Sequence, residues 1–332
     1  MLKSPFTATW AVTYRCNLRC SHCFIGENRN VAEMSSKDAL GMIKILAETG
    51  IFKLGISGGE PLLRKDIFDI IKCARDYGIK ITLATNGILI SEFVAQMFHK
   101  LEIYPAVSLE GARESTHALL RGKTFDSVIR GIHNLTKCDV PFFILTTLTK
   151  GNEKEILKIY HILERYKGAG LTLNRLIPHG RARALNSIRL SPFDYKKILI
   201  KICDLQKKGC KIFVDESLKP LLSTITSIRH ECPAGKFTVS ITPDGRLQPC
   251  EALKEFTCSQ QFKDKETLLY EWLMCTALKT IRHFDATNIS QCRSCKYFDL
   301  CGGGCRAATY AVNGNLIAPD PDCWSKGGDL WA

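Results

Sequence analysis

The sequence CNLRCSHCF at residues 16–24 carries three thiols, Cys16, Cys20 and Cys23, separated by three and then two residues. With this spacing, one loop can place the thiols at three corners of an iron–sulfur cube. Four-iron clusters normally take four cysteines, so the fourth iron would be free of protein ligands. Such an iron can bind and activate a small molecule, which predicts a catalytic cluster rather than a structural one.

A zinc site is the alternative for the same loop. Zinc would require a fourth Cys or His, and the nearest candidate, His22, lies between two of the thiols. From that position its ring cannot easily turn inward to complete a tetrahedron. The loop therefore favours iron and sulfur over zinc.

Short β-rich runs alternate with amphipathic helical segments from residue 7 to about residue 180. This pattern predicts six βα units around a parallel sheet, an α/β fold in the form of a partial (β/α)6 TIM barrel. The cysteine loop follows the first strand, so it would lie at the mouth of the barrel where active sites collect. The expected strands are 7–14, 53–57, 79–84, 106–109, 142–148 and 170–177, and the expected helices are 35–50, 65–76, 91–101, 125–136 and 154–166.

The composition is that of a globular chain, with 45% hydrophobic and 24% charged residues among 332. No apolar run approaches the length of a membrane span, and residues 1–6 lack the hydrophobic region of a signal peptide, so we expect a cytoplasmic protein without a membrane partner. The formal charge of +13 favours an acidic partner or substrate. The sequence contains no helix-turn-helix, RNP motif or long basic run, so nothing in it indicates nucleic acid binding.

A second group of cysteines begins at residue 232. Strands predicted at 237–242 and 246–250 would form a hairpin that brings Cys232 and Cys250 together. Cytoplasmic thiols stay reduced, so we interpret the group as metal ligands rather than disulfides. Seven thiols do not divide into two sets of four, which argues against two zinc ribbons and favours two clusters, one with an incomplete ligand set. The seven are Cys232, Cys250, Cys292, Cys295, Cys301, Cys305 and Cys323.

The loop at residues 16–24, placed after an apolar strand, resembles the loop of the radical S-adenosylmethionine (SAM) enzymes. In that family the open iron is chelated by SAM, and an electron from the cluster cleaves SAM to a 5′-deoxyadenosyl radical. The resemblance continues after later strands at SGGEP (57–61), TNG (85–87), SLEG (108–111, with Glu110 where the family usually has Asp) and RG (121–122). It implies that SAM is bound by His22, Gly58, Gly59, Glu60, Asn86, Ser108, Arg121 and Leu176.

The seven later cysteines match the spacing of the SPASM extension of radical SAM enzymes, a small cysteine-rich α+β domain with two auxiliary four-iron clusters. The resemblance implies an outer cluster on Cys292, Cys295, Cys301 and Cys323, and an inner one on Cys232, Cys250 and Cys305. Cys258, Cys210, a carboxylate or an open iron could complete the inner cluster. Glu251 stands where some SPASM enzymes have a carboxylate that takes the substrate proton, so it is the candidate catalytic residue. We expect Cys73, Cys138 and Cys275 to be packing residues.

The expected domains are a radical SAM barrel at 1–185, a bridging segment at 186–231 and a SPASM domain at 232–332. The expected cofactors are three [4Fe–4S] clusters and SAM. The resemblance implies a radical SAM oxidoreductase that abstracts hydrogen from a ribosomally made peptide, forming a thioether or carbon–carbon crosslink or oxidising a side chain. Because only fifteen residues precede Cys16, a separate protein would recognise the peptide leader. A flavodoxin- or ferredoxin-type protein would supply electrons.

Other functions stay open at this point. A tetrapyrrole enzyme of the haem pathway shares the layout, and a positive mouth would attract propionates as readily as an acidic peptide. Anaerobic sulfatase maturation is a third reading. An electron-transfer iron–sulfur protein or a zinc-bound scaffold is the non-enzymatic alternative, although neither would have a use for GGEP and an open three-thiol loop.

Overall fold

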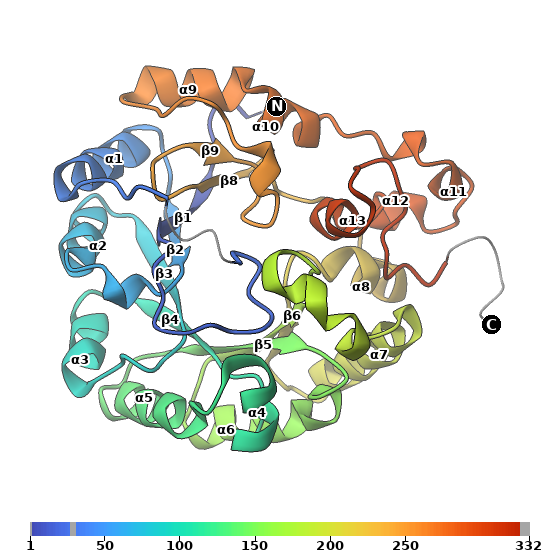
Figure 1. Cartoon of the computed structure of the whole chain (residues 1–332), viewed down its shortest axis with the longest axis horizontal. Coiled ribbons are helices and arrows are strands. Elements are labelled where there is room, and N and C mark those ends of the chain that lie inside the picture. Colours follow the sequence, from blue (N-terminus) through green and yellow to red (C-terminus); the bar gives the residue numbers. More distant parts are fainter. Residues whose placement is uncertain (1, 27–30, 326–332) are drawn as a thin grey trace.

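The computed structural model describes residues 2–26 and 31–325 of the chain, and within them a single curved sheet runs through the molecule (Figure 1). Its strand order is β7-β6-β5-β4-β3-β2-β1-β8-β9. All neighbouring pairs are parallel except β8 and β9, which form an antiparallel hairpin. The strands are β1 (Thr7–Thr13), β2 (Lys53–Gly58), β3 (Lys80–Thr85), β4 (Tyr104–Ser108), β5 (Phe143–Leu148), β6 (Gly170–Arg175), β7 (Ile212–Val214), β8 (Thr238–Ile241) and β9 (Leu247–Gln248).

The expected six-stranded partial barrel is confirmed as β1 to β6, and the α/β fold class with it. The sheet also has strands at both edges that the barrel prediction did not include. On one side β7, from the predicted bridging segment, pairs with β6, and on the other β8 pairs with β1. The hairpin expected around residues 237–250 is thus present, but it extends the barrel sheet. The predicted domain boundaries stay a prediction.

Helices cover the outer face of the sheet, as Figure 1 shows for α1, α2, α3, α5 and α6. The first of them illustrates how the sequence determines an element. Ser35 Oγ accepts a hydrogen bond from Asp38 N at 3.2 Å, which satisfies one of the free N–H groups at the helix start. Buried residues of α1 are Ala39, Met42, Ile43 and Leu46, the apolar stripe that faces the sheet.

Helices α1, α2, α3, α5 and α6 agree with the expected positions within a few residues, and the structure also has α4, α7 and α8, of which α4 and α8 were not predicted. They are α1 (Ser36–Glu48), α2 (Ile67–Asp76), α3 (Glu92–Lys100), α4 (Glu114–Arg121), α5 (Phe125–Lys137), α6 (Ile156–Arg165), α7 (Pro192–Lys207) and α8 (Lys219–Thr226), with the short 3-10 helices η1 (Pro61–Leu63), η2 (Glu153–Glu155) and η3 (Gly180–Ile188).

The main core lies between the sheet and these helices. Trp10, Leu54, Ile81, Phe98 and Ile144 have no more than 1% of their surface exposed. Burying one such side chain contributes about 1.5–3 kcal/mol. The packed layer holds the strands rigidly, and so it fixes the loops at their carboxyl ends.

Residues 249–325 are mostly short helices and loops beside the barrel (Figure 1). Within residues 2–26 and 31–325, no helix is both long and apolar enough to cross a membrane. The elements after β9 are η4 (Lys254–Phe256), α9 (Lys265–Met274), α10 (Thr276–Arg282), η5 (Ala286–Asn288), α11 (Ser290–Arg293), α12 (Phe298–Cys301) and α13 (Arg306–Asn313).

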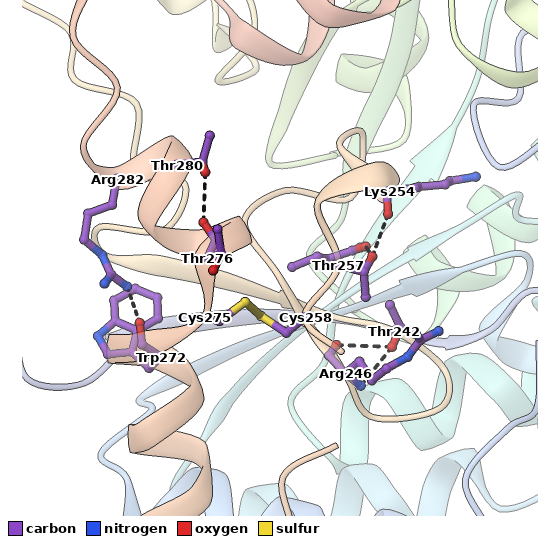
Figure 2. The surroundings of a disulfide bond; sticks show 11 residues. Thr242, Arg246, Lys254, Thr257, Cys258, Trp272, Cys275, Thr276, Thr280 and Arg282 are labelled. Carbon is purple, nitrogen blue, oxygen red and sulfur yellow. Dashed lines mark hydrogen bonds between the residues drawn. A yellow bond between two sulfur atoms is a disulfide. The ribbon is translucent and has the colours of Figure 1, made fainter. Parts of the chain in front are cut away.

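One pair of cysteines in this region departs from the prediction that the cysteines are metal ligands or packing residues. Cys258 and Cys275 form a disulfide with a Cα–Cα distance of 5.9 Å (Figure 2). It joins the loop after η4 to the junction between α9 and α10. Cys258, a candidate fourth ligand of the inner cluster, and Cys275, expected to be a packing residue, are therefore each other's covalent partner.

Candidate active site

The three-thiol loop lies at the mouth of the barrel, directly after β1 (Figure 1, dark blue). Cys20 is buried, and Cys16 and Cys23 are half-buried. Burial raises the pKa of the Cys20 thiol, an effect that the nearby Arg121 opposes and the charges of Cys16 and Cys23 reinforce. The three thiols are thus close neighbours, are not joined to one another by disulfides, and have the charge interactions of a shared site.

The glycine pair after β2 allows the strand to cross the start of the cysteine loop. Gly59 N donates to Thr13 O at 2.7 Å, and Glu60 N donates to Arg15 O at 2.8 Å. A Cβ atom on Gly58 would lie 2.1 Å from Thr13 O, and one on Gly59 would lie 2.1 Å from Arg15 O. The backbone contact therefore requires glycine at both positions, and it fixes the cysteine loop against β2.

Glu60 connects the ends of β2 and β3. Its side chain is fully buried and accepts hydrogen bonds from Thr85 Oγ1 at 2.9 Å, Asn86 N at 2.8 Å and Leu62 N at 3.2 Å. Burial raises the pKa of this carboxyl group, and the donated hydrogen bonds oppose that rise. Asn86 in turn donates from Nδ2 to Asn17 Oδ1 at 2.7 Å, so the turn after β3 also holds the cysteine loop.

A buried ion pair supports the loop from the other side. Arg121 Nε donates to Glu110 Oε1 at 2.9 Å, and its Nη1 lies 3.6 Å from Cys20 Sγ. Burial alone would raise the pKa of Glu110, but the charge of Arg121, the contact with His22 and the hydrogen bond from Thr147 N together lower it to about 2. Glu110 also accepts from Thr147 N at 2.6 Å. The pair thus presents a fixed cation to the thiols.

His22 carries a buried polar atom that fits a bound group. Its Nε2 lies 3.4 Å from Glu110 Oε1, whereas Nδ1 is buried without a hydrogen-bond partner among the residues that the structure describes. Buried polar atoms are nearly always hydrogen-bonded. An unsatisfied ring nitrogen between Cys20 and Cys23 fits a site where a polar cofactor completes the contacts. The three clustered thiols likewise suit an iron–sulfur cluster with one open iron.

The two other predicted SAM contacts lie at the carboxyl ends of β4 and β6. Ser108 is the last residue of β4, and Leu176 directly follows β6; both are buried. The structure therefore brings all eight predicted SAM-binding residues to the end of the barrel that carries the cysteine loop. Their individual contacts with SAM stay predictions.

Glu251 reaches the same mouth from the C-terminal part of the chain. Ser57 Oγ, at the end of β2, donates to Glu251 Oε1 across 194 positions of sequence. Burial raises the pKa of Glu251, and the hydrogen bond from Ser57 and the charge of Lys254 oppose the rise. A half-buried carboxyl group beside Gly58 is placed where a base near the cofactor would be needed, and its role as a base stays a prediction.

The predicted outer cluster ligands share one cavity. Cys292, Cys295, Cys301 and Cys323 all line it, together with Asp320. Burial raises the pKa of Cys301 to about 12 and that of Cys323 to about 11. Thiols in such surroundings become thiolates readily only when a metal compensates the charge. The geometry supports the predicted assignment.

The predicted inner ligands also lie near one another. Burial raises the pKa of Cys305 to about 12, and the charge of Cys232 contributes to the rise. Burial also raises the pKa of Cys250, and the charges of Cys305 and Cys232 add to that rise. Of the suggested cysteine candidates for a fourth ligand, Cys258 is excluded by its disulfide with Cys275. Cys210 packs against the main core beside β7. The inner set is therefore three thiols from three separate segments.

Two cations that the motif analysis did not include as site residues also hold the cysteine loop. Arg181, after β6, donates from Nε to Cys20 O and from Nη1 to Gly26 O, both at 2.8 Å. Lys254 donates to the carbonyl oxygens of Phe24 and Ile25. The partners are more than 150 positions apart in the sequence, so no local motif marks them. The only sequence signal is the position of Lys254, four residues after Cys250.

The comparisons with known proteins agree with this geometry. Residues 10–163 match the family model of the radical SAM superfamily. The AdoMet-dependent heme synthase of Methanosarcina barkeri is 28% identical, and the match covers 97% of this chain and 97% of that protein. The mycofactocin maturase MftC of Mycobacterium tuberculosis is 27% identical, over 97% of this chain and 83% of that protein.

Among solved structures, the fold matches Streptococcus suis SuiB bound to S-adenosylmethionine with a TM-score of 0.82. That match has 20% sequence identity and covers 98% of this chain and 78% of SuiB. The alignment extends well beyond the barrel, so it includes the region of the later cysteines. The shared fold therefore includes the barrel and the region of the later cysteines.

Proposed function

Because residues 10–163 of this chain are a radical SAM domain, we propose that the protein is a radical SAM enzyme that modifies a ribosomally made peptide. The observation that carries the proposal is the similarity over 97% of the chain to a maturase, joined to a fold shared with SuiB, which has also been solved with its precursor peptide SuiA. When bound, a [4Fe–4S] cluster and SAM supply a carbon radical able to abstract hydrogen.

The residues of the barrel mouth would hold these groups. Cys16, Cys20 and Cys23 would ligate three irons, leaving the fourth for SAM. Arg121, fixed by Glu110 and 3.6 Å from Cys20 Sγ, places a positive charge beside the site. The fork of its guanidinium group suits a carboxylate.

A groove beside the cysteine loop is the proposed path of the peptide. Phe24, Ile25 and Gly26 form one part of its lining. The other parts are His179, Gly180 and Arg181 after β6, and Lys254 and Glu255 from η4. Two cationic side chains, Arg181 and Lys254, against the one carboxylate of Glu255 favour a substrate segment with acidic side chains.

We extend the proposal to two auxiliary clusters on the inner and outer cysteine sets, and to Glu251 as the base that takes a substrate proton. The shared cavity of Cys292, Cys295, Cys301 and Cys323 supports the outer cluster. A flavodoxin- or ferredoxin-type protein would supply electrons, and a separate protein would recognise the peptide leader. A cytoplasmic location likewise stays a prediction.

Coexpression tests the proposed substrate class. The full chain would be produced anaerobically with each short open reading frame that neighbours its gene, and the peptides analysed by mass spectrometry. We expect one peptide to lose a pair of hydrogen atoms, as bond formation or oxidation requires. The same peptide should be unchanged with the C16A/C20A/C23A variant. Failure of every neighbouring peptide to change would count against a peptide substrate.

A tetrapyrrole substrate is the second candidate, favoured by one observation. The AdoMet-dependent heme synthase is covered over 97% of its own length, compared with 83% for MftC. The cationic groove would also accept the propionates of a porphyrin. Incubation of the reconstituted protein with a propionate-bearing iron porphyrin, followed by mass spectrometry, distinguishes the two, because only this candidate predicts a change in the porphyrin.

A further inference from the structure

The side chain of Lys254 lies against the backbone of the loop that carries the N-terminal thiols. Its Nζ donates to Phe24 O at 3.0 Å and to Ile25 O at 2.8 Å. Both carbonyl groups directly follow Cys23. An ammonium that satisfies two backbone acceptors makes charge-assisted hydrogen bonds, which are stronger than neutral ones. The loop is therefore fixed by a residue from the C-terminal part of the chain.

The surroundings of Lys254 hold it in this position. Its Nζ lies 5.7 Å from the ring centroids of both Tyr14 and Phe24. Burial lowers the pKa of Lys254, while the charges of Cys23, Glu255 and Glu251 act against that change. The backbone is also anchored, since Thr257 Oγ1 donates to Lys254 O at 2.6 Å, and the disulfide of Cys258 follows directly (Figure 2).

Lys254 does not act on the loop alone. Arg181 donates to Cys20 O and Gly26 O, so the two cations contact one carbonyl group between Cys20 and Cys23 and three carbonyl groups after Cys23. Gly180 packs so closely that a Cβ atom there would lie 2.6 Å from Phe24 O. Arg181 belongs to the barrel, whereas Lys254 belongs to the segment that carries the inner cysteines. Of these two cations, Lys254 is therefore the one that connects the loop to the auxiliary region.

The segment from Cys250 to Lys254 makes three contacts within five residues. Cys250 is one of the inner thiols, Glu251 accepts from Ser57 at the end of β2, and Lys254 holds the cysteine loop. A turn keeps them together, because Leu253 N donates to Cys250 O at 3.0 Å. Displacement of one end of so short a segment moves the other. The two cysteine sites are thus mechanically linked.

We propose that Lys254 is a positioning residue that fixes the loop of Cys16, Cys20 and Cys23 from the auxiliary region and stabilises negative charge on the cluster bound there. The inference rests on the proposed function for the identity of that cluster. The inference goes beyond the proposed function because it assigns to the auxiliary region a residue that directly contacts the SAM-binding loop. The positive charge near Cys23 favours the reduced, more negative state of the cluster.

The test compares the Lys254→Met and Lys254→Arg variants with a Lys265→Met control, all as full-length, anaerobically reconstituted proteins. Methionine keeps an apolar stem but cannot donate, and Lys265 is an exposed residue at the start of α9. The first readout is amide hydrogen exchange at Cys23 and Gly26, whose N–H groups bond within the loop. The second is the change that SAM causes in the electron paramagnetic resonance (EPR) spectrum of the reduced protein.

Loss of the charged hydrogen bonds should speed exchange at these amides about tenfold in K254M and raise the SAM concentration for half-maximal spectral change by a similar factor. The reduction potential of the SAM-responsive cluster should become more negative. K254R should recover at least part of both effects, and K265M should match the unmodified protein.

Equal exchange in K254M and K265M would overturn the proposal. That comparison needs no SAM, so it decides the role of Lys254 even if the proposed function fails. The proposed function would fail separately, if SAM left the spectrum of the unmodified protein unchanged.

Discussion

Arg175 and Asp320 form a buried ion pair between the last strand of the barrel and the last cysteine segment. Arg175 Nη1 donates to Asp320 Oδ2 at 2.9 Å, and the two side chains are 0% and 1% exposed. The same oxygen accepts from Cys305 N at 2.8 Å, while Arg175 Nε donates to Asp322 Oδ2 at 2.7 Å. Asp320 also lines the cavity of the outer thiols. One arginine of β6 thus orders the backbone next to both auxiliary sites.

Replacing Arg175 should therefore destabilise the auxiliary region. Arg175→Met removes the ion-pair partner of the buried Asp320 and leaves Asp322 paired with Arg189, and loss of a buried partner of this kind costs roughly 3–5 kcal/mol. We expect a lower urea midpoint and loss of iron from the auxiliary sites, while the SAM-dependent spectral change persists. Arg183→Met is the control, because that side chain is exposed. Equal stability and iron content in R175M and R183M would show that the pair does not have this role.

Removing the disulfide should affect stability but not iron. Cys258 and Cys275 are 17 positions apart, and crosslinks that close loops of this size contribute roughly 3 kcal/mol. The C258A/C275A variant should unfold at lower urea and keep its full iron content. Cys305→Ala, by contrast, should lose iron. A drop in iron in the double variant matching that of C305A would mean that Cys258 or Cys275 is a ligand after all.

Acid should weaken the fold through His117. This residue is fully buried, accepts from Glu110 N through Nδ1 at 3.2 Å and contacts Thr124 Oγ1 through Nε2. Burial lowers its pKa from 6.5 to about 4, with Arg121 adding to the effect. Because the folded form binds the proton less tightly, its stabilising contribution is present above pH 6.5 and is lost as the pH falls toward 4.

The expected loss between pH 7.5 and pH 5.5 is roughly 1.4 kcal/mol for this one group. Urea unfolding at the two pH values measures it, and His117→Gln should show a correspondingly smaller difference. The prediction is wrong if H117Q and the unmodified protein lose the same stability over this interval.

Changing Glu251 to Gln should separate SAM cleavage from substrate oxidation. Glutamine keeps an oxygen acceptor for Ser57 Oγ, so the contact with the end of β2 is retained, but glutamine cannot take up a proton. With the peptide found by coexpression, E251Q should still form 5′-deoxyadenosine, while modified peptide per cleaved SAM falls by about 100-fold, the lower range for general bases. An unchanged ratio would exclude Glu251 as the base.

Local sequence patterns predicted most of the barrel. The spacing of apolar residues, caps such as Ser35 and the glycine at residue 50 mark each βα unit independently of the rest, so α1 and the six strands could be found from short windows. The position of the cysteine loop beside the motifs at the other strand ends could be predicted from the strand order alone. A parallel barrel brings all carboxyl ends of its strands to one side.

Contacts between distant residues could not be predicted in this way. Lys254 and Phe24 are 230 positions apart, and Arg175 and Asp320 are 145 positions apart. Nothing near any of these residues marks its partner. The disulfide between Cys258 and Cys275 could not be predicted for a related reason, because the reducing state of the cytoplasm applies to all thiols alike and does not tell which two the fold brings into contact. The pairing of β8 with β1 likewise depends on tertiary packing.

Reductive cleavage of SAM is the most direct test of the central claim that the loop at Cys16, Cys20 and Cys23 holds a cluster with one iron open to SAM. Anaerobically reconstituted protein would be mixed with SAM and dithionite, and 5′-deoxyadenosine measured by chromatography. We predict its formation by the unmodified protein and its absence in the C16A/C20A/C23A variant, which keeps both auxiliary cysteine sets. An unmodified protein that holds its iron yet forms no 5′-deoxyadenosine, or a triple variant that forms as much, would contradict the account.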